Sequence, residues 1–142
     1  MYNGYILSAK KAAVKQNHAT VVEMVAAYAT RCSAGGTVQY TNVSGNKSTF
    51  KCPDRIGEFV KYMNEHVYGL NFESPYGMGN PSWCKINVTN CSPPGFMSAC
   101  PSHPDQLGYL SIFASNRNTI KVCSNLEYTS RTVYIENDVL FE

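Results

Sequence analysis

The sequence is poor in charged residues and has no long apolar run. Charged residues make up 15% of its 142 positions, well below the ~25% of an average soluble protein. No apolar stretch reaches the ~18 residues of a membrane span, and the printed residues show no signal-peptide pattern, as expected if both were removed with an upstream part of the helix. The formal net charge of +2 gives no support to a nucleic-acid partner. The surface must therefore be rich in Asn, Ser, Thr and Tyr, which suits a protein outside the cell.

Motifs for catalysis and for cofactor binding are missing as well. The chain has no GxSxG, HExxH, P-loop or dinucleotide fingerprint, so we predict that it is no enzyme and takes no cofactor. His66 follows the polar residues Asn64 and Glu65 and is predicted to lie on the surface. Glu136 and Asp138, two residues apart on an expected strand, indicate a solvated edge rather than a calcium site, which needs more oxygen ligands.

The cysteines form an even set: Cys32, Cys52, Cys84, Cys91, Cys100 and Cys123. Such a set favours disulfides and an oxidising compartment, and without CxxC pairs it does not favour zinc. We predict that all six are paired. The Cys32–Cys52 bond is the best supported, because it would tie the end of one helix to the start of the next; Cys84–Cys91 and Cys100–Cys123 would complete the set, although spacing alone leaves other pairings open.

Residues 4–32 contain no proline and no internal glycine, and their apolar spacing predicts a helix. One narrow stripe should pack on a sheet; it contains Val14, His18, Val21, Val25, Tyr28 and Cys32. The opposite side carries small residues with Glu23 as its only charge, namely Ala9, Ala12, Ala19, Ala26 and Ala27. Because a solvent-facing side normally carries more charge, we expect a second buried face, although alanine is also simply the best helix former.

The start of this helix is unusual for a free end. No capping residue is followed by an acidic first turn, and Lys10, Lys11 and Lys15 oppose the helix dipole. We therefore expect the helix to continue upstream in the natural protein, with Met1 marking a cut.

The middle of the chain, residues 33–104, is predicted to be a loop region with one short helix. A short edge strand at VQYTNV should wrap around the domain rather than pack into it. Pro53-Asp54 should open the helix, with Asp54 as its cap, and the helix should end near Tyr68-Gly69. From residue 70 onward, glycine, proline and cysteine indicate turns held by disulfides, around Trp83.

The last third, residues 105–142, reads as sheet. Three runs rich in β-branched residues, 108–116, 118–126 and 130–141, predict an antiparallel meander with a turn at Asn116-Arg117-Asn118. The predicted fold is therefore one α+β domain over residues 1–142, in which a long N-terminal helix packs on an antiparallel sheet.

The stretch YNGYILSAKKAAVKQNHATVVEMVAAYATRC is similar to the C-terminal half of a type IV pilin helix, and LNFESPYG resembles the KNPY-type turn of some pilins. Together with the meander and the cysteine-closed region, the chain resembles a type IV pilin without the hydrophobic N-terminal half of its helix. The resemblance implies an extracellular fibre of identical, methylated subunits that supports adhesion, twitching motility or DNA uptake. Before assembly, each subunit would be anchored in the inner membrane through the missing segment, and the chain alone would be a monomer.

Two other functions fit parts of this pattern. A pseudopilin of a type II secretion system would share the long helix, although such subunits often lack an elaborate cysteine-rich region. A secreted, disulfide-stapled binding module would share the cysteines. The small-residue side of the helix separates these classes, because a free domain would hide or charge it, whereas a fibre subunit would bury it against neighbouring helices.

Overall fold

The computed structural model describes residues 2–42, 44–53, 55–70, 100, 110–128 and 132–141. Its elements are α1 (Tyr2–Ser33), β1 (Thr37–Thr41), β2 (Lys47–Lys51), α2 (Ile56–Gly69), β3 (Leu110–Asn116), β4 (Thr119–Tyr128) and β5 (Thr132–Leu140). The predicted α+β class, with a long N-terminal helix, a short second helix and antiparallel sheets, is confirmed. Within the described residues, neither helix combines the length and apolar character that a membrane span requires.

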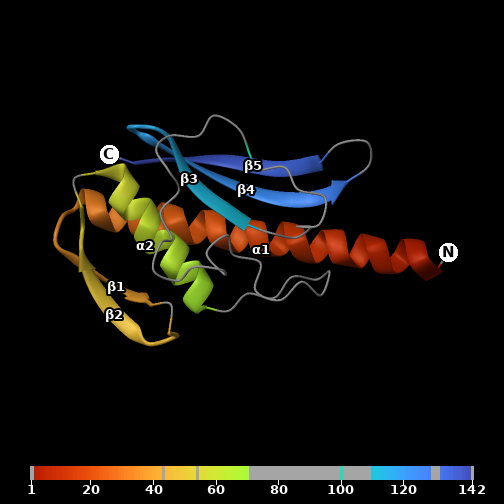
Figure 1. Cartoon of the computed structure of the whole chain (residues 1–142), viewed down its shortest axis with the longest axis horizontal. Helices are drawn as coiled ribbons and strands as arrows, with labels where there is room; N and C mark the ends of the chain where they lie inside the picture. Colours follow the sequence, from red (N-terminus) through yellow and green to blue (C-terminus); the bar gives the residue numbers. More distant parts are fainter. Residues whose placement is uncertain are drawn as a thin grey trace.

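The C-terminal strands form a three-stranded antiparallel meander in the order β3-β4-β5, which lies along the long helix α1 (Figure 1). Ile112 pairs with Val122, and Val122 pairs with Asn137 on its other side. At the turn between β3 and β4, the Asn118 N–H donates to Oδ1 of Asn116 over 2.9 Å. The predicted meander and its turn are therefore both present.

The main core lies between this sheet and the two helices. Helix α1 contacts β4 and β5, while α2 contacts β3. Val21 and Val25 from α1 meet Ile120 and Val122 from β4, and all four side chains are 0% exposed. Each fully buried aliphatic side chain contributes roughly 1.5–3 kcal/mol to folding, so this seam is a major source of stability.

Helix α2 follows the predicted apolar spacing. Its buried side chains include those expected from the sequence: Ile56, Phe59, Val60, Met63 and Val67. Arg55 occupies the N-cap position without a side-chain cap bond, and the predicted cap, Asp54, lies outside the described residues. Nδ2 of the buried Asn64 donates to the carbonyl oxygens of Val60 and Ile112, both over 3.0 Å, and so satisfies a backbone acceptor of the edge strand β3.

The prediction that the segment after α1 wraps without packing was wrong. β1 pairs with β2 in an antiparallel hairpin, in which Val38, Tyr40 and Phe50 are buried. The Phe50 ring stacks on that of Tyr62 in α2, with centroids 4.3 Å apart. Strand β2 was not predicted because KSTFK holds a single large apolar residue, Phe50. That residue is enough to anchor the hairpin on the helix.

The prediction of a surface position for His66 was also wrong, since its side chain is only 7% exposed. Its polar sequence neighbours are misleading, because contact along a helix runs three and four residues apart. Met63 and Val67 lie on the same buried side of α2. The Tyr28 ring of α1 packs against the imidazole edge to face, with centroids 5.1 Å apart.

Two disulfides staple the described part of the chain. The predicted Cys32–Cys52 bond is present and ties the end of α1 to the segment before α2. A second bond joins Cys100 to Cys123 of β4, as one of the predicted pairings has it. Cys84 and Cys91 lie outside the described residues, as do Trp83 and the LNFESPYG segment after its first residue, Leu70.

Candidate functional site

The candidate site is the side of α1 turned away from the sheet. Ala9, Ala12, Ala19 and Ala27 are exposed, and Ala26 is half-buried, where it packs against the edge of the core. The opposite side holds the stripe predicted to contact the sheet. Cys32 is partly buried, and the other members are buried: Val14, His18, Val21, Val25 and Tyr28. Helix α1 therefore has one side in the core and one small-residue side without cover among the described residues.

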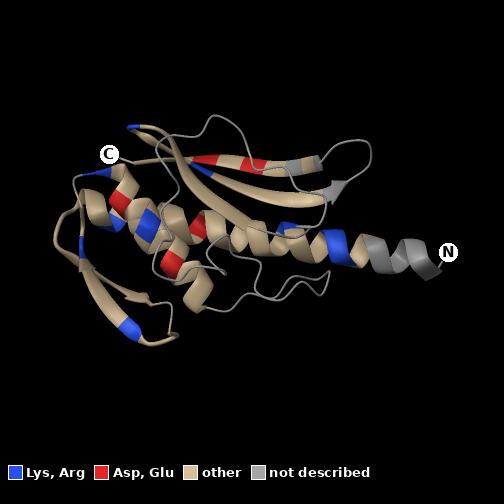
Figure 2. Ribbon diagram, in the orientation of Figure 1, with Lys and Arg blue, Asp and Glu red and all other residues tan. Residues whose placement is uncertain are grey.

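This exposed side carries little charge. Figure 2 shows that most of α1 beyond its N-terminal turns is free of charged residues. Lys15, one turn before Ala19, is exposed together with Glu23, one turn after it. The prediction that Glu23 is the only charge of this side is thus corrected, since the side bears one cation and one anion four residues on either side of Ala19.

The hydroxyl groups on this side point back to the helix. Thr20 Oγ1 donates to the carbonyl oxygen of Gln16, and Thr30 Oγ1 donates to that of Ala26, each over 2.9 Å. These donors are therefore satisfied within α1. A partner surface could approach the small side chains closely without leaving those hydroxyl groups unpaired.

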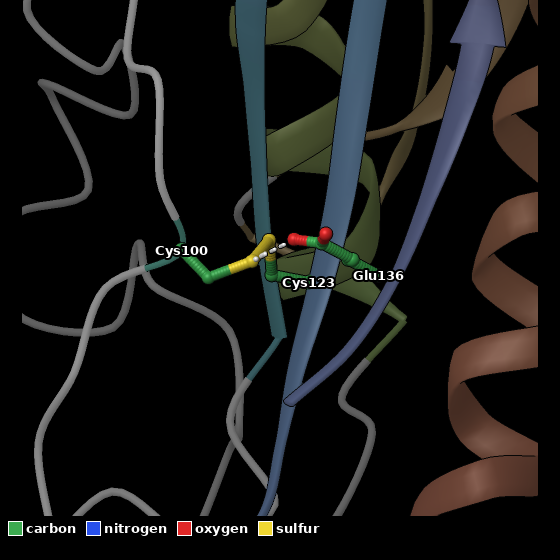
Figure 3. A group of neighbouring side chains, drawn as sticks. All are labelled: Cys100, Cys123 and Glu136. Atoms are coloured by element: carbon green, nitrogen blue, oxygen red, sulfur yellow. Dashed lines mark hydrogen bonds between the residues drawn. A yellow bond between two sulfur atoms is a disulfide. The ribbon is translucent and has the colours of Figure 1, made fainter. Parts of the chain in front are cut away.

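A second cluster lies on the outer face of the sheet, where Glu136 approaches the disulfide of Cys100 and Cys123 (Figure 3). The strand register places Cys123 opposite Glu136, and Glu136 Oε2 lies 3.1 Å from Cys100 Sγ. A disulfide sulfur carries no hydrogen, so we interpret this contact as packing rather than as hydrogen bonding. Since both sulfur atoms are consumed in the bond, neither is a thiolate ligand, and the trio holds no metal in this oxidised form.

The predicted acidic pair on β5 forms ion pairs with a lysine of β4. Lys121 Nζ lies 3.8 Å from Glu136 Oε2 and 3.6 Å from Asp138 Oδ1. Both carboxylate side chains are more than half exposed, so each ion pair contributes little to stability. The pair behaves as the solvated strand edge that its spacing predicts.

A third cluster joins a serine, a histidine and an asparagine between α1 and the sheet. His18 Nδ1 lies 2.7 Å from Ser124 Oγ, and Nε2 lies 2.7 Å from Asn137 Oδ1. This order of groups is that of a nucleophile, a base and an orienting partner. Ser124 is 0% exposed, however, so no substrate reaches its hydroxyl and the cluster is a structural link.

Sequence reasoning placed His18 in the buried stripe but missed its partners. The available signal was a single polar residue within an otherwise apolar stripe, because a buried imidazole needs hydrogen-bond partners on the facing element. Strand alternation puts Ser124 on the same face as Ile120 and Val122, the face that packs on α1. Nothing in the local pattern distinguished Asn137 from the other polar residues of SRTVYIENDVLF.

Comparison of the chain with protein-family models, with curated proteins and with solved structures gave no match in any of the three. The assignment of a function therefore depends on the fold and on the surface of α1.

Proposed function

We propose that the chain is the globular head of a structural subunit of an extracellular fibre of the type IV pilus kind. The order of its elements supports this proposal: a long helix, a disulfide-closed region with a short second helix, and a C-terminal antiparallel meander laid along the first helix. The partners are other copies of the same subunit. No cofactor, metal or nucleic acid takes part in the assembly.

One observation carries the proposal, namely that α1 has two sides of different chemistry. Val21 and Val25 anchor it in the core at 0% exposure, whereas Ala12 and Ala19 are exposed. Small side chains let two helix backbones approach closely, as in helix pairs that pack through small residues. Packed against α1 of neighbouring subunits, this side would gain the burial that the isolated domain does not provide.

The test compares alanine-to-glutamate substitutions in the natural gene of the host organism. Ala19→Glu places a charge in the middle of the proposed contact, while Ala34→Glu changes an exposed alanine just past the end of α1. Surface fibres are labelled with an antibody to this domain and counted by electron microscopy. The proposal expects Ala19→Glu to abolish labelled fibres and Ala34→Glu to preserve them, with equal amounts of folded subunit in both strains.

Wild-type numbers of fibres in the Ala19→Glu strain would overturn the proposal. So would recovery of the wild-type protein as a free monomer in the medium without any labelled fibre, a result that favours the secreted binding module.

A further inference from the structure

His18 lies at the boundary between two halves of α1 that differ in how many of their described side chains are buried in the core. The C-terminal half is fixed by Val21, Val25 and Tyr28 in the main core and by the Cys32–Cys52 bond. Of the described side chains before His18, only Val14 is buried. The contact of His18 with the sheet therefore adds two hydrogen bonds to the packing of Val14 in holding the N-terminal half in place.

The two hydrogen bonds of His18 define its neutral form. Oδ1 of Asn137 can only accept, so Nε2 carries the ring proton and donates it over 2.7 Å. Nδ1 then accepts from the hydroxyl of Ser124, also over 2.7 Å. One ring of α1 is thus bonded to β4 and β5 at the same time.

No described carboxylate faces this ring. The charged groups on the adjoining turns of α1 are cations, Lys11 and Lys15. The inner-face positions nearest this ring hold uncharged residues: Ile120, Val122, Ser124, Ile135, Asn137 and Val139. Lys121, Glu136 and Asp138 alternate with these and lie on the other face of the sheet. The register places Glu127, opposite Val133, farther along the same face of β4 as Ser124, and its side chain is not among those described. Burial lowers the pKa of His18, against the smaller opposing effect of the Asn137 hydrogen bond.

We propose that His18 is a proton-operated latch, which in its neutral form fixes the N-terminal half of α1 to the sheet and on proton uptake releases that half while the rest of the fold persists. The Ser124 hydroxyl can rotate to accept a proton from Nδ1, but the imidazolium would still lack water and a counter-ion. Opening of the helix hydrates the charge. This inference stands on the fold alone and does not depend on fibre assembly.

The difference between the His18 pKa values of the closed and the opened state sets how strongly opening depends on pH. The opened state binds the proton near the ordinary histidine pKa of about 6.5, whereas the closed state binds it only at lower pH. Between these two values, the equilibrium constant for opening rises by up to about tenfold per pH unit. Above about pH 6.5, neither state is protonated and the latch stays closed.

The experiment measures amide hydrogen exchange by NMR on the whole chain between about pH 7.5 and about pH 5, the range in which histidine titrates. Exchange rates are divided by the intrinsic rates at each pH. We expect protection at residues 10–17 to start below that at residues 21–31 and to fall as the pH falls, because the N-terminal half opens while the rest of the fold persists. His18→Gln, which cannot take up a proton, should make residues 10–17 independent of pH, whereas His66→Asn should leave the loss unchanged.

A second readout on the wild-type chain keeps the proposal testable if His18→Gln does not fold. The ring protons of His18 are followed in the same samples, and their titration must share its midpoint with the loss of protection at residues 10–17. Different midpoints or constant protection at residues 10–17 across this range would each overturn the latch. So would equal protection in both halves of α1, because both halves would then exchange only through global unfolding.

Discussion

The backbone N–H of Thr41 donates a hydrogen bond to Nδ1 of His66 across 2.8 Å, linking the β1-β2 hairpin to helix α2. Because Nδ1 must keep its lone pair for this bond, the folded state requires the neutral ring with its proton on Nε2. Burial also lowers the pKa of His66. Two buried histidines, His18 and His66, thus oppose protonation in the folded state.

The free energy of unfolding should therefore fall in mild acid. The unfolded chain takes up protons at about pH 6.5, whereas both folded-state histidine pKa values are lowered. These groups leave stability unchanged above about pH 6.5, reduce it as the pH falls below that value, and reach a limit below the folded-state pKa values. Urea titrations between about pH 5 and about pH 7.5 check this prediction.

Two substitutions at His66 separate its charge from its hydrogen bond. His66→Asn keeps a side-chain oxygen near the position of Nδ1 and cannot titrate, so we expect a weaker pH dependence and a small loss of stability at neutral pH. His66→Ala leaves the Thr41 N–H without its acceptor and should cost about 1–3 kcal/mol at neutral pH. An unchanged pH dependence in His66→Asn would show that this ring is not one of the titrating groups.

The two sides of α1 should respond very differently to charge in the isolated domain. Val21→Glu places an unpaired carboxylate where the native side chain is 0% exposed, and we expect it to cost more than about 4 kcal/mol or to prevent folding. Ala19→Glu changes an exposed position and should alter stability by less than about 0.5 kcal/mol. Thermal melting by circular dichroism compares the two; equal melting temperatures would contradict the assigned orientation of α1.

Two glycines of α2 form a matched pair. A Cβ added to Gly69 would overlap the backbone carbonyl of Asn42, whereas one added to Gly57 meets no other atom. We expect Gly69→Ala to push the hairpin from the helix and cost about 1–3 kcal/mol. Gly57→Ala should stabilise the protein by about 0.5–1 kcal/mol through helix propensity. Urea midpoints measure both effects, and a stabilising Gly69→Ala would rule out the close approach.

Loss of the Cys32–Cys52 bond should destabilise the domain without changing its fold. The bond spans a sequence separation of 20, for which the chain-entropy model gives about 3 kcal/mol. The double variant Cys32→Ser and Cys52→Ser should unfold at a correspondingly lower urea concentration. A far-ultraviolet spectrum that differs from the native one would instead show that the bond is needed to form the hairpin or α2.

Periodic segments were the predictable part of this fold. Helices and strands repeat with fixed periods, so the spacing of apolar residues predicts which face is buried. This applies to Val21 and Val25 on α1 and to Ile120 and Val122 on β4. The Cys32–Cys52 pair could be predicted because it joins two expected helix boundaries. These features depend on local patterns, which a single sequence contains in full.

Contacts between distant segments were not predictable in the same way. His66 is buried because the hairpin covers it, and Asn137 matters because it faces His18 from another element. Neither contact produces a periodic pattern in the sequence. On the candidate site, the sequence marked the small-residue side of α1, but only the packing of the opposite side shows that the alanines are left exposed.

The Cys32–Cys52 disulfide also determines how far the chain can be stretched. It bridges a loop with a sequence separation of 20 that contains the whole β1-β2 hairpin, so tension applied to the two ends passes through the sulfur atoms and bypasses the hairpin. At about 3.3–3.6 Å per residue, the loop has an extended length of roughly 70 Å, and it cannot be pulled out until the bond is reduced. A subunit that carries load along α1 would thus limit its own extension by covalent means, even after its strands have separated.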